Sequence, residues 1–279
     1  MPGNLQTYPH ALPKVKQVSD PKKELRPISL TSTLSKIAED FVVTNYIKPA
    51  VIKSIDRKQF GTISGSSTVM ALISMLHKWL GDTDSRGSTI RVLLCDYRKA
   101  FDLIGHSLLL TQLKQLDIPH SIINWVVSFL TCRSQRVKLG QDCFSEWGVV
   151  PSGVSQGTKL GPWLFLVMIN DLSIPDPFSI WKYVDDSTVS ETISKGEQSN
   201  MQLAANQVQD CSKENLFQLN CDKTKELESD GNIQDELMRD QFITSSYQGF
   251  FSDITYKQNY ENRERNAGTR TSELQRQAQ

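Results

Sequence analysis

The chain holds 279 residues, of which 38% are hydrophobic, and its 31 basic side chains balance its 31 acidic ones. This length and apolar content predict a globular protein of one large or two modest domains. Because no uninterrupted apolar run reaches about 18 residues and the first residues lack the basic-then-apolar order of a signal peptide, we expect an intracellular protein, nuclear or cytoplasmic, that is not secreted and has no membrane partner.

Residues 1–25 are rich in Pro, Lys and polar side chains, and they predict an extended segment without a core of its own. The basic residues of this region lie close together along the chain: Lys14, Lys16, Lys22, Lys23 and Arg26. A solvated basic loop and a phosphate-binding arm both account for such a cluster. Apolar residues at helical spacing then predict a helix over residues 30–51, ending near Pro49, and another over residues 65–80.

The middle of the chain predicts one buried strand, two helices and a hairpin. Residues 89–96 form a short run of β-branched and large apolar side chains that ends at Asp96, which favours a buried strand. Residues 106–116 and 119–131 show helical spacing, and the alternation over residues 134–150 favours a hairpin.

The last predicted elements surround a pair of adjacent acids. They are a strongly apolar helix over residues 158–172, strands over residues 178–184 and 187–193, and a helix over residues 197–217. Beyond this helix the chain becomes polar and loses its periodicity, so we expect residues 226–279 to form a disordered or degenerate tail.

The cysteines and the charge distribution narrow the range of partners. Five cysteines, widely spaced and without a Cys-x-x-Cys pair, favour free thiols over disulfides or a zinc site, so no disulfide-linked partner is expected. Residues 1–225 carry 25 Lys and Arg against 21 Asp and Glu, whereas residues 226–279 carry 6 against 10. Although the whole chain has no net charge, residues 1–225 are net basic, which is compatible with a nucleic-acid partner.

Asp185 and Asp186 stand side by side where the last two predicted strands meet. Adjacent carboxylates repel each other, and such a pair taken alone is typical of a solvated turn. Asp96 offers a third carboxylate at the end of the first strand, and Asp102 lies shortly beyond it. Clustered carboxylate oxygens are ligands for Mg²⁺ or Mn²⁺, and two-metal phosphoryl transfer requires a cluster of this kind.

Five stretches resemble, in their order and separation, the motifs of reverse transcriptases: "LRPISLTSTLSKIAED", "CDYRKAFDLIGHSLLL", "PSGVSQGTKLGPWLFLVMINDL", "KYVDD" and "LNCDKTK". They are most similar to the enzymes of non-LTR (LINE-like) retrotransposons, and the resemblance covers residues 12–225. It implies an α+β fold with right-hand polymerase fingers and palm, in which an antiparallel palm sheet is backed by helices. The family's active polymerases add a thumb after the last motif, and because the polar tail offers no convincing helical bundle, we expect the thumb to be missing or degenerate. Residues 1–25 would be a partial fingers segment and residues 26–225 the fingers–palm domain.

The resemblance also implies roles for the residues that match the motifs. Asp96 and Asp185 match the catalytic aspartates that hold metal ions, Asp186 is the adjacent acid, and the backbone carbonyl of Tyr97 completes the metal shell. Lys223 matches the candidate that protonates or neutralises the departing pyrophosphate, and a solvated surface lysine is the alternative.

Further positions match the site of the incoming nucleotide. Phe101 matches the steric gate that crowds a ribose 2′-hydroxyl, with a core aromatic as the alternative. Gln156 and Gly157 match the pair that packs against the nucleotide, and Arg26 matches the fingers arginine on the triphosphate, where a planar guanidinium suits phosphate oxygens. Two lysines are candidate partners of that arginine: Lys14 and Lys16.

The implied activity is that of an RNA-directed DNA polymerase. An RNA template, a DNA primer and deoxynucleoside triphosphates would be the partners, and two Mg²⁺ ions, with Mn²⁺ as a substitute, the cofactors. Two alternatives remain open at this point: a catalytically inactive remnant of a retroelement that at most binds RNA, and a viral-type RNA-dependent RNA polymerase. Phe101 distinguishes an RNA-directed DNA polymerase from a viral-type RNA-dependent RNA polymerase, because a ribonucleotide polymerase is not expected to carry a bulky gate there.

Overall fold

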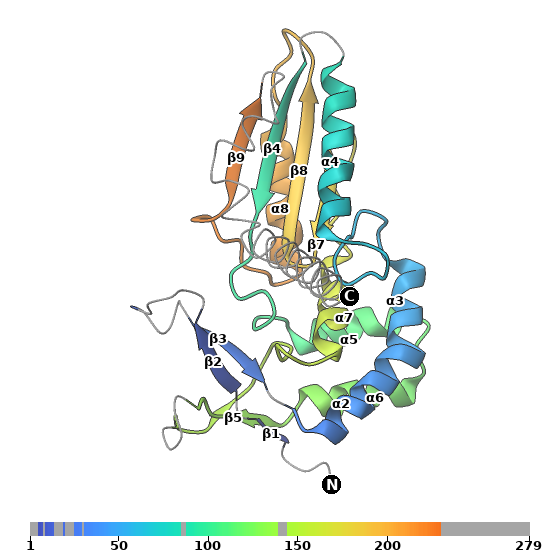
Figure 1. The fold of residues 1–279 in the computed structure, drawn as a ribbon, viewed down its shortest axis with the longest axis vertical. Helices are drawn as coiled ribbons and strands as arrows, with labels where there is room; N and C mark the ends of the chain where they lie inside the picture. The colour runs from blue at the N-terminus through green and yellow to red at the C-terminus, as the bar shows by residue number, and fades with distance from the viewer. Residues whose placement is uncertain are drawn as a thin grey trace, which may run out of the picture.

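A four-stranded antiparallel sheet and a group of helices beneath it make up most of the described chain (Figure 1). The structure is a computed structural model that describes residues 5–7, 9–13, 19, 25–29, 31–84, 88–138 and 144–229. The strands of the sheet, in the order β7-β8-β4-β9, are β7 (Ser179–Tyr183), β8 (Asp186–Ile193), β4 (Thr89–Cys95) and β9 (Lys225–Ser229). An antiparallel sheet accompanied by helices confirms the predicted α+β class.

Strand β4 is buried on both faces, because a helix covers each side of the sheet. Side chains alternate along a strand, so Ile90, Val92 and Leu94 join one apolar cluster, which α4 (Thr68–Thr83) shares. Leu93 and Cys95 point the other way and join the larger cluster, which includes the buried side of α8 (Met201–Glu214). The continuous apolar run that predicted this strand reflects burial on both sides.

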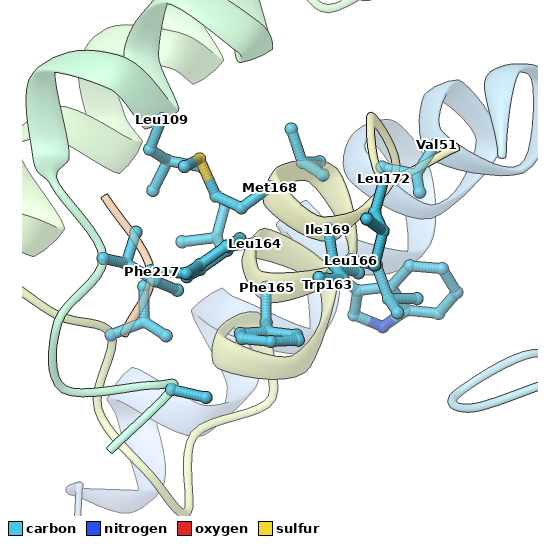
Figure 2. Packing of buried hydrophobic residues seen from close by; sticks show 14 of the residues in the cluster. Val51, Leu109, Trp163, Leu164, Phe165, Leu166, Met168, Ile169, Leu172 and Phe217 are labelled. Carbon is cyan, nitrogen blue, oxygen red and sulfur yellow. The ribbon is translucent and has the colours of Figure 1, made fainter. Parts of the chain in front are cut away.

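Helix α7 (Leu160–Ile169) is the centre of the larger cluster, and all of its residues except Pro162 are buried. Figure 2 shows Leu164 and Met168 on the side of Leu109 and Phe217, while Trp163 lies on the side of Val51. The surrounding helices are α2 (Thr33–Val42), the π-helical turn η1 (Val43–Ile47), α3 (Lys48–Ser54), α5 (His106–Gln115) and α6 (His120–Leu130). A helix that is apolar all round is expected in such an interior position.

Two small strand groups lie at the lower left of Figure 1. The antiparallel pair is β2 (Pro9–Pro13) with β3 (Leu25–Ser29). The second group is β1 (Leu5–Thr7), parallel to β5 (Arg133–Gln135), which pairs in turn with β6 (Gly148–Val149). The pairing of β5 with β6 confirms the predicted hairpin over residues 134–150, whose tip at residues 139–143 lies outside the described residues.

The structure corrects two predicted boundaries. Pro49 does not end the helical run, because it occupies the first turn of α3, where proline is tolerated, and α3 continues to Ser54. Strand β9 pairs with Ile90–Leu94 of β4 and extends to Ser229, so the domain continues past the boundary predicted at residue 225. The sequence of β9 does not look like a strand because its glutamates, Glu226 and Glu228, form ion pairs with the partly exposed Arg91, at 2.8 and 3.4 Å.

The rest of the tail, from residue 230, lies outside the described residues, and with it the prediction of a missing or degenerate thumb. Among the residues that the structure describes, no helix combines the length and apolar character needed to cross a membrane.

Candidate active site

The register of the sheet brings Asp96 and the acidic pair to the same end. Cys95, the last residue of β4, lies opposite Ser187 of β8. In an antiparallel pair the next residue of one strand faces the preceding residue of the other, so Asp96 follows at the end where Asp186 begins β8. Asp185 lies in the two-residue turn between Tyr183 and Asp186, which pair with each other. Residues about 90 positions apart in the sequence are thereby gathered at one sheet edge.

The three carboxylates interact through space. Burial, together with the negative charges of Asp185 and Asp96, raises the pKa of Asp186 from its ordinary value of 3.8 to about 7, and the positive charge of Lys223 partly opposes this rise. Part of this shift comes from the two neighbouring carboxylates, whose negative charge Lys223 offsets only in part. The site therefore favours an added cation.

Asp96 is held by the loop that follows α8. Asn220 donates from Nδ2 to Asp96 Oδ1 at 2.9 Å and from its backbone N–H to the Asp96 carbonyl at 2.8 Å. Lys223 Nζ lies 3.5 Å from Asp96 Oδ2, and its backbone N–H donates to the Asn220 carbonyl at 2.9 Å, which closes a turn. Lys223 therefore lies beside Asp96. The sequence reasoning missed Asn220, although its place in a turn motif next to the predicted lysine was a usable signal.

The side chain of Tyr97 belongs to the core. The residue is 5% exposed, its ring packs on Phe217 with the centroids 5.3 Å apart, and its hydroxyl accepts from Ser212 at 3.4 Å. The side chain is therefore committed to the interior. Only the carbonyl remains for the predicted role as a metal ligand.

Phe101 sits between the core and the predicted nucleotide site. Its ring stacks on Phe165 of α7 with the centroids 4.8 Å apart, and its carbonyl accepts from Val154 at 2.8 Å. The ring is half-buried. The two interpretations of Phe101, steric gate and core aromatic, are thus compatible with each other, because one face is packed and the residue keeps an exposed part.

The turn at Gln156 and Gly157 docks on β3. The Gln156 carbonyl accepts from the backbone N–H of Ser29 at 2.9 Å, and Gln156 Nε2 donates to Asp102 at 3.4 Å. Gly157 has φ +90°, and a Cβ there would lie 2.9 Å from Ile28 and 3.0 Å from the Ser29 carbonyl. The resemblance assigned Gly157 to the pair that packs against the nucleotide. The structure adds a reason for glycine at this position, since the adjacent strand already requires it.

The basic residues of the predicted triphosphate site are only partly described. Arg26 belongs to β3 and pairs with Leu12 of β2. Strand β3 is the same strand that receives the Gln156–Gly157 turn, so the backbone of Arg26 belongs to this side of the site. Its side chain, and all of Lys14 and Lys16, lie outside the described residues.

A buried carboxylate that the sequence reasoning missed anchors the start of α7. Glu39 is fully buried, and its Oε2 accepts from the backbone N–H groups of Lys159 and Leu160, at 2.9 and 3.4 Å. A carboxylate at a helix N-terminus satisfies free N–H groups and complements the helix dipole. Arg133 is also buried; burial lowers the pKa of its guanidinium, and the negative charge of Glu39 raises it. Glu39 escaped notice because its spacing assigns it to the polar face of an amphipathic helix.

The oxygen donors at this sheet end suit a divalent cation, but their side chains do not lie close enough together to coordinate one. Among the described residues, no three His, Cys, Asp or Glu side chains are gathered closely enough to hold a metal ion as they stand. Carboxylates and a main-chain carbonyl are the oxygen ligands that Mg²⁺ and Mn²⁺ prefer. The placement of Asp96, Asp185 and Asp186 at one sheet end is the observation that favours a cation here.

Comparisons with known proteins agree with this geometry. The chain is 31% identical over 152 residues to the "Probable RNA-directed DNA polymerase from transposon X-element" of Drosophila melanogaster, which covers 54% of this chain and 16% of that protein. It is 26% identical over 161 residues to the "Retrovirus-related Pol polyprotein from type-1 retrotransposable element R2" of Popillia japonica, covering 58% of this chain and 22% of that protein. The chain thus spans about a fifth of the length of these relatives.

The fold is also similar to a solved structure, the apo telomerase of Candida tropicalis truncated from its C-terminal domain. The TM-score is 0.53 at 12% identity, over 82% of this chain and 51% of that one. A family profile described as "Reverse transcriptase (RNA-dependent DNA polymerase)" matches residues 12–250. With its aspartates gathered at one end of an antiparallel sheet, the chain belongs to the reverse transcriptase family, and its curated relatives are the polymerases of non-LTR retrotransposons.

Proposed function

We propose that this chain is the fingers–palm part of an RNA-directed DNA polymerase, which extends a DNA primer on an RNA template with deoxynucleoside triphosphates. The observation that carries the proposal is the register of β4 against β8, which sets Asp96 and Asp186 at one sheet end with Asp185 in the adjoining turn. The family to which the chain belongs supports the same activity.

The carboxylates of Asp96, Asp185 and Asp186, with the Tyr97 carbonyl, would hold two divalent ions, Mg²⁺ or Mn²⁺. Reverse transcriptases as a family use divalent ions, which in such a site acidify the attacking primer 3′-hydroxyl and stabilise the departing pyrophosphate. Lys223, next to Asp96, would neutralise or protonate that pyrophosphate. The chain's other residues align the substrates, and alignment supplies much of the catalysis in phosphoryl transfer.

The nucleotide would lie between the palm carboxylates and β3. Gln156 and Gly157 form a turn that docks on β3, and Arg26 of the same strand would bind the triphosphate with Lys14 or Lys16. Phe101, half-buried against Phe165, would crowd a 2′-hydroxyl and so select deoxynucleotides.

Primer extension by the purified chain tests the proposal, on a primed RNA template with Mg²⁺ and deoxynucleotides. We expect extension by the wild type, and a loss of at least about 100-fold with Asp185→Asn, because a carboxylate that holds the metal is gone. Asp117→Asn is the matched control, since Asp117 is exposed and makes only a surface ion pair with Lys53.

A folded chain that extends no primer under these conditions would contradict the proposal and favour the inactive remnant. Equal loss in the Asp117→Asn variant would show that the substitution acts through stability rather than through the proposed metal site.

A further inference from the structure

Residues 58–61, more than a hundred positions upstream, bind the backbone beside the turn that carries Asp185. Lys182 in β7 donates from its backbone N–H to the Lys58 carbonyl at 2.8 Å, and its own carbonyl accepts from Phe60 at 2.8 Å. Gln59 and Lys182 thereby form a parallel bridge beside β7. The segment follows the strand up to its last residues and brings the Gln59 side chain against the turn.

Gln59 holds the main chain of the turn through one oxygen atom. The residue is 5% exposed, and its Oε1 accepts from the backbone N–H of Val184 at 3.1 Å and from that of Gly61 at 2.8 Å. Its Nε2 is buried and makes no hydrogen bond in the structure. The acceptor oxygen is therefore the atom that matters for the turn.

The conformation of Val184 needs such support. Val184 has φ +57°, in the left-handed region that β-branched residues rarely adopt. It is the first of the two turn residues, and Asp185 is the second. Rotation of the Val184 peptide toward a more favourable conformation would re-aim the Asp185 side chain directly, because the two residues are bonded neighbours.

Gly61 lets the segment come this close. A Cβ on Gly61 would lie 2.4 Å from Val184 Cγ2 and 2.6 Å from the Val184 backbone nitrogen, which is closer than atoms can approach. Glycine is thus required for the approach itself, since any side chain there would push the turn away.

We infer that Gln59 and Gly61 are positioning residues of the polymerase site, which hold the Val184 peptide so that Asp185 and Asp186 face Asp96. The inference rests on the proposed function and deepens it. Neither residue needs to touch the substrate, because both act through the turn. Groups that orient metal-binding side chains typically change metal affinity or activity by about 10- to 100-fold when they are removed.

Gln59→Met tests the inference, since methionine has a similar shape but offers no comparable acceptor for the two N–H groups. Amide hydrogen exchange at Val184, followed by NMR, is expected to become about fivefold faster or more, which corresponds to one lost hydrogen bond. We expect kcat for primer extension to fall about 10- to 100-fold, while KM for the nucleotide changes less than about threefold. Mn²⁺ affinity, measured by electron paramagnetic resonance, is expected to fall over the same range.

Two further variants keep the result interpretable. Gln207→Met, on the exposed side of α8, is the matched control and is expected to leave all three quantities unchanged. Gly61→Ala is expected to reproduce the loss of kcat and of Mn²⁺ affinity by displacement of the turn, with slow exchange in β4 as the sign that the variant is folded.

The possible outcomes separate the inference from the proposed function. A wild type that neither extends a primer nor binds Mn²⁺ would defeat the proposed function. An active wild type whose Gln59→Met variant has the same kcat and Mn²⁺ affinity, or the same Val184 exchange rate, would defeat the inference alone.

Discussion

The charge of Asp186 is disfavoured in the folded chain. Burial is the main cause of its raised pKa, and the charges of Asp185 and Asp96 add to it. The three acids at one sheet end therefore favour the binding of a cation, and they lower the stability of the folded protein when no cation is bound. Such a conflict between function and stability is common where charges are gathered for catalysis.

The first prediction concerns Asp186→Asn. The folded pKa of about 7 lies above the ordinary 3.8, so the folded chain keeps a proton that the unfolded chain has already lost. Stability from this group is present below pH 3.8 and declines as the pH rises toward 7. Asp186→Asn removes this loss and is expected to stabilise the metal-free protein by about 2 to 4 kcal/mol at pH 8.

Thermal unfolding of both proteins across pH 4 to 8, without divalent ions, checks this. The gain of the variant should grow with pH up to about 7 and then level off. A gain that is independent of pH would contradict the assignment of the effect to this carboxyl group.

A second residue-level prediction concerns Phe101→Ala. If Phe101 crowds the 2′-hydroxyl, its truncation should raise the relative use of ribonucleotides by about 10-fold or more, measured as the ratio of kcat/KM for the two sugars. Loss of the stack on Phe165 should also cost about 1 to 3 kcal/mol of stability. Phe144→Ala, at an exposed ring outside the predicted site, is the control. Reduced stability with unchanged sugar preference would leave Phe101 as a core aromatic only.

At the scale of elements, the connection between α2 and α7 joins two parts that the sequence separates by more than a hundred residues. Glu39 of α2 binds the first N–H groups of α7, directly after the Gln156–Gly157 turn. The period of the α2 sequence predicted the helix correctly, but apolar spacing does not say which face is buried. The apolar residues Leu34, Ile37 and Phe41 are exposed, and Glu39 is buried instead.

The third prediction uses this connection. Glu39→Ala leaves two helix N–H groups and the buried Arg133 without their carboxylate, and it is expected to cost about 3 to 5 kcal/mol. The neighbour Asp40 supplies a matched control, because it is exposed and binds only the Lys159 side chain. Asp40→Ala should cost less than about 1 kcal/mol. Denaturant unfolding measures both, and equal costs would show that Glu39 does not anchor α7.

Across the whole molecule, burial is visible in the sequence, whereas contacts between distant residues are not. The apolar runs predicted β4, β7 and β8 because burial on a sheet leaves a direct mark on composition. Strand β9 left no such mark, since its glutamates face Arg91 and solvent. The three aspartates were found through local motifs, whereas Asn220, Glu39 and Gln59 act through partners far away in the chain, which spacing does not reveal.

The fourth prediction concerns the extent of the domain. A chain that ends at residue 224 loses β9 and uncovers the edge of β4 along Ile90–Leu94. We expect it to be less stable by several kcal/mol and more prone to aggregate, because an uncovered strand edge invites pairing between chains. A chain that ends at residue 250, where the family match stops, should keep its stability. Thermal unfolding compares the stability of the two chains, and light scattering compares their aggregation. Equal stability and equal aggregation would show that β9 is not part of the folded domain.

Strand β4 is shared by the two apolar clusters of the protein. Its alternate side chains belong to two different apolar clusters, and Asp96 follows its last residue. A void created on either face of the sheet would shift the same strand and move the same carboxylate. We therefore expect the same effect, a displaced Asp96, from loss of packing near α4 and from loss of packing near α8, although the two clusters lie on opposite faces of the sheet.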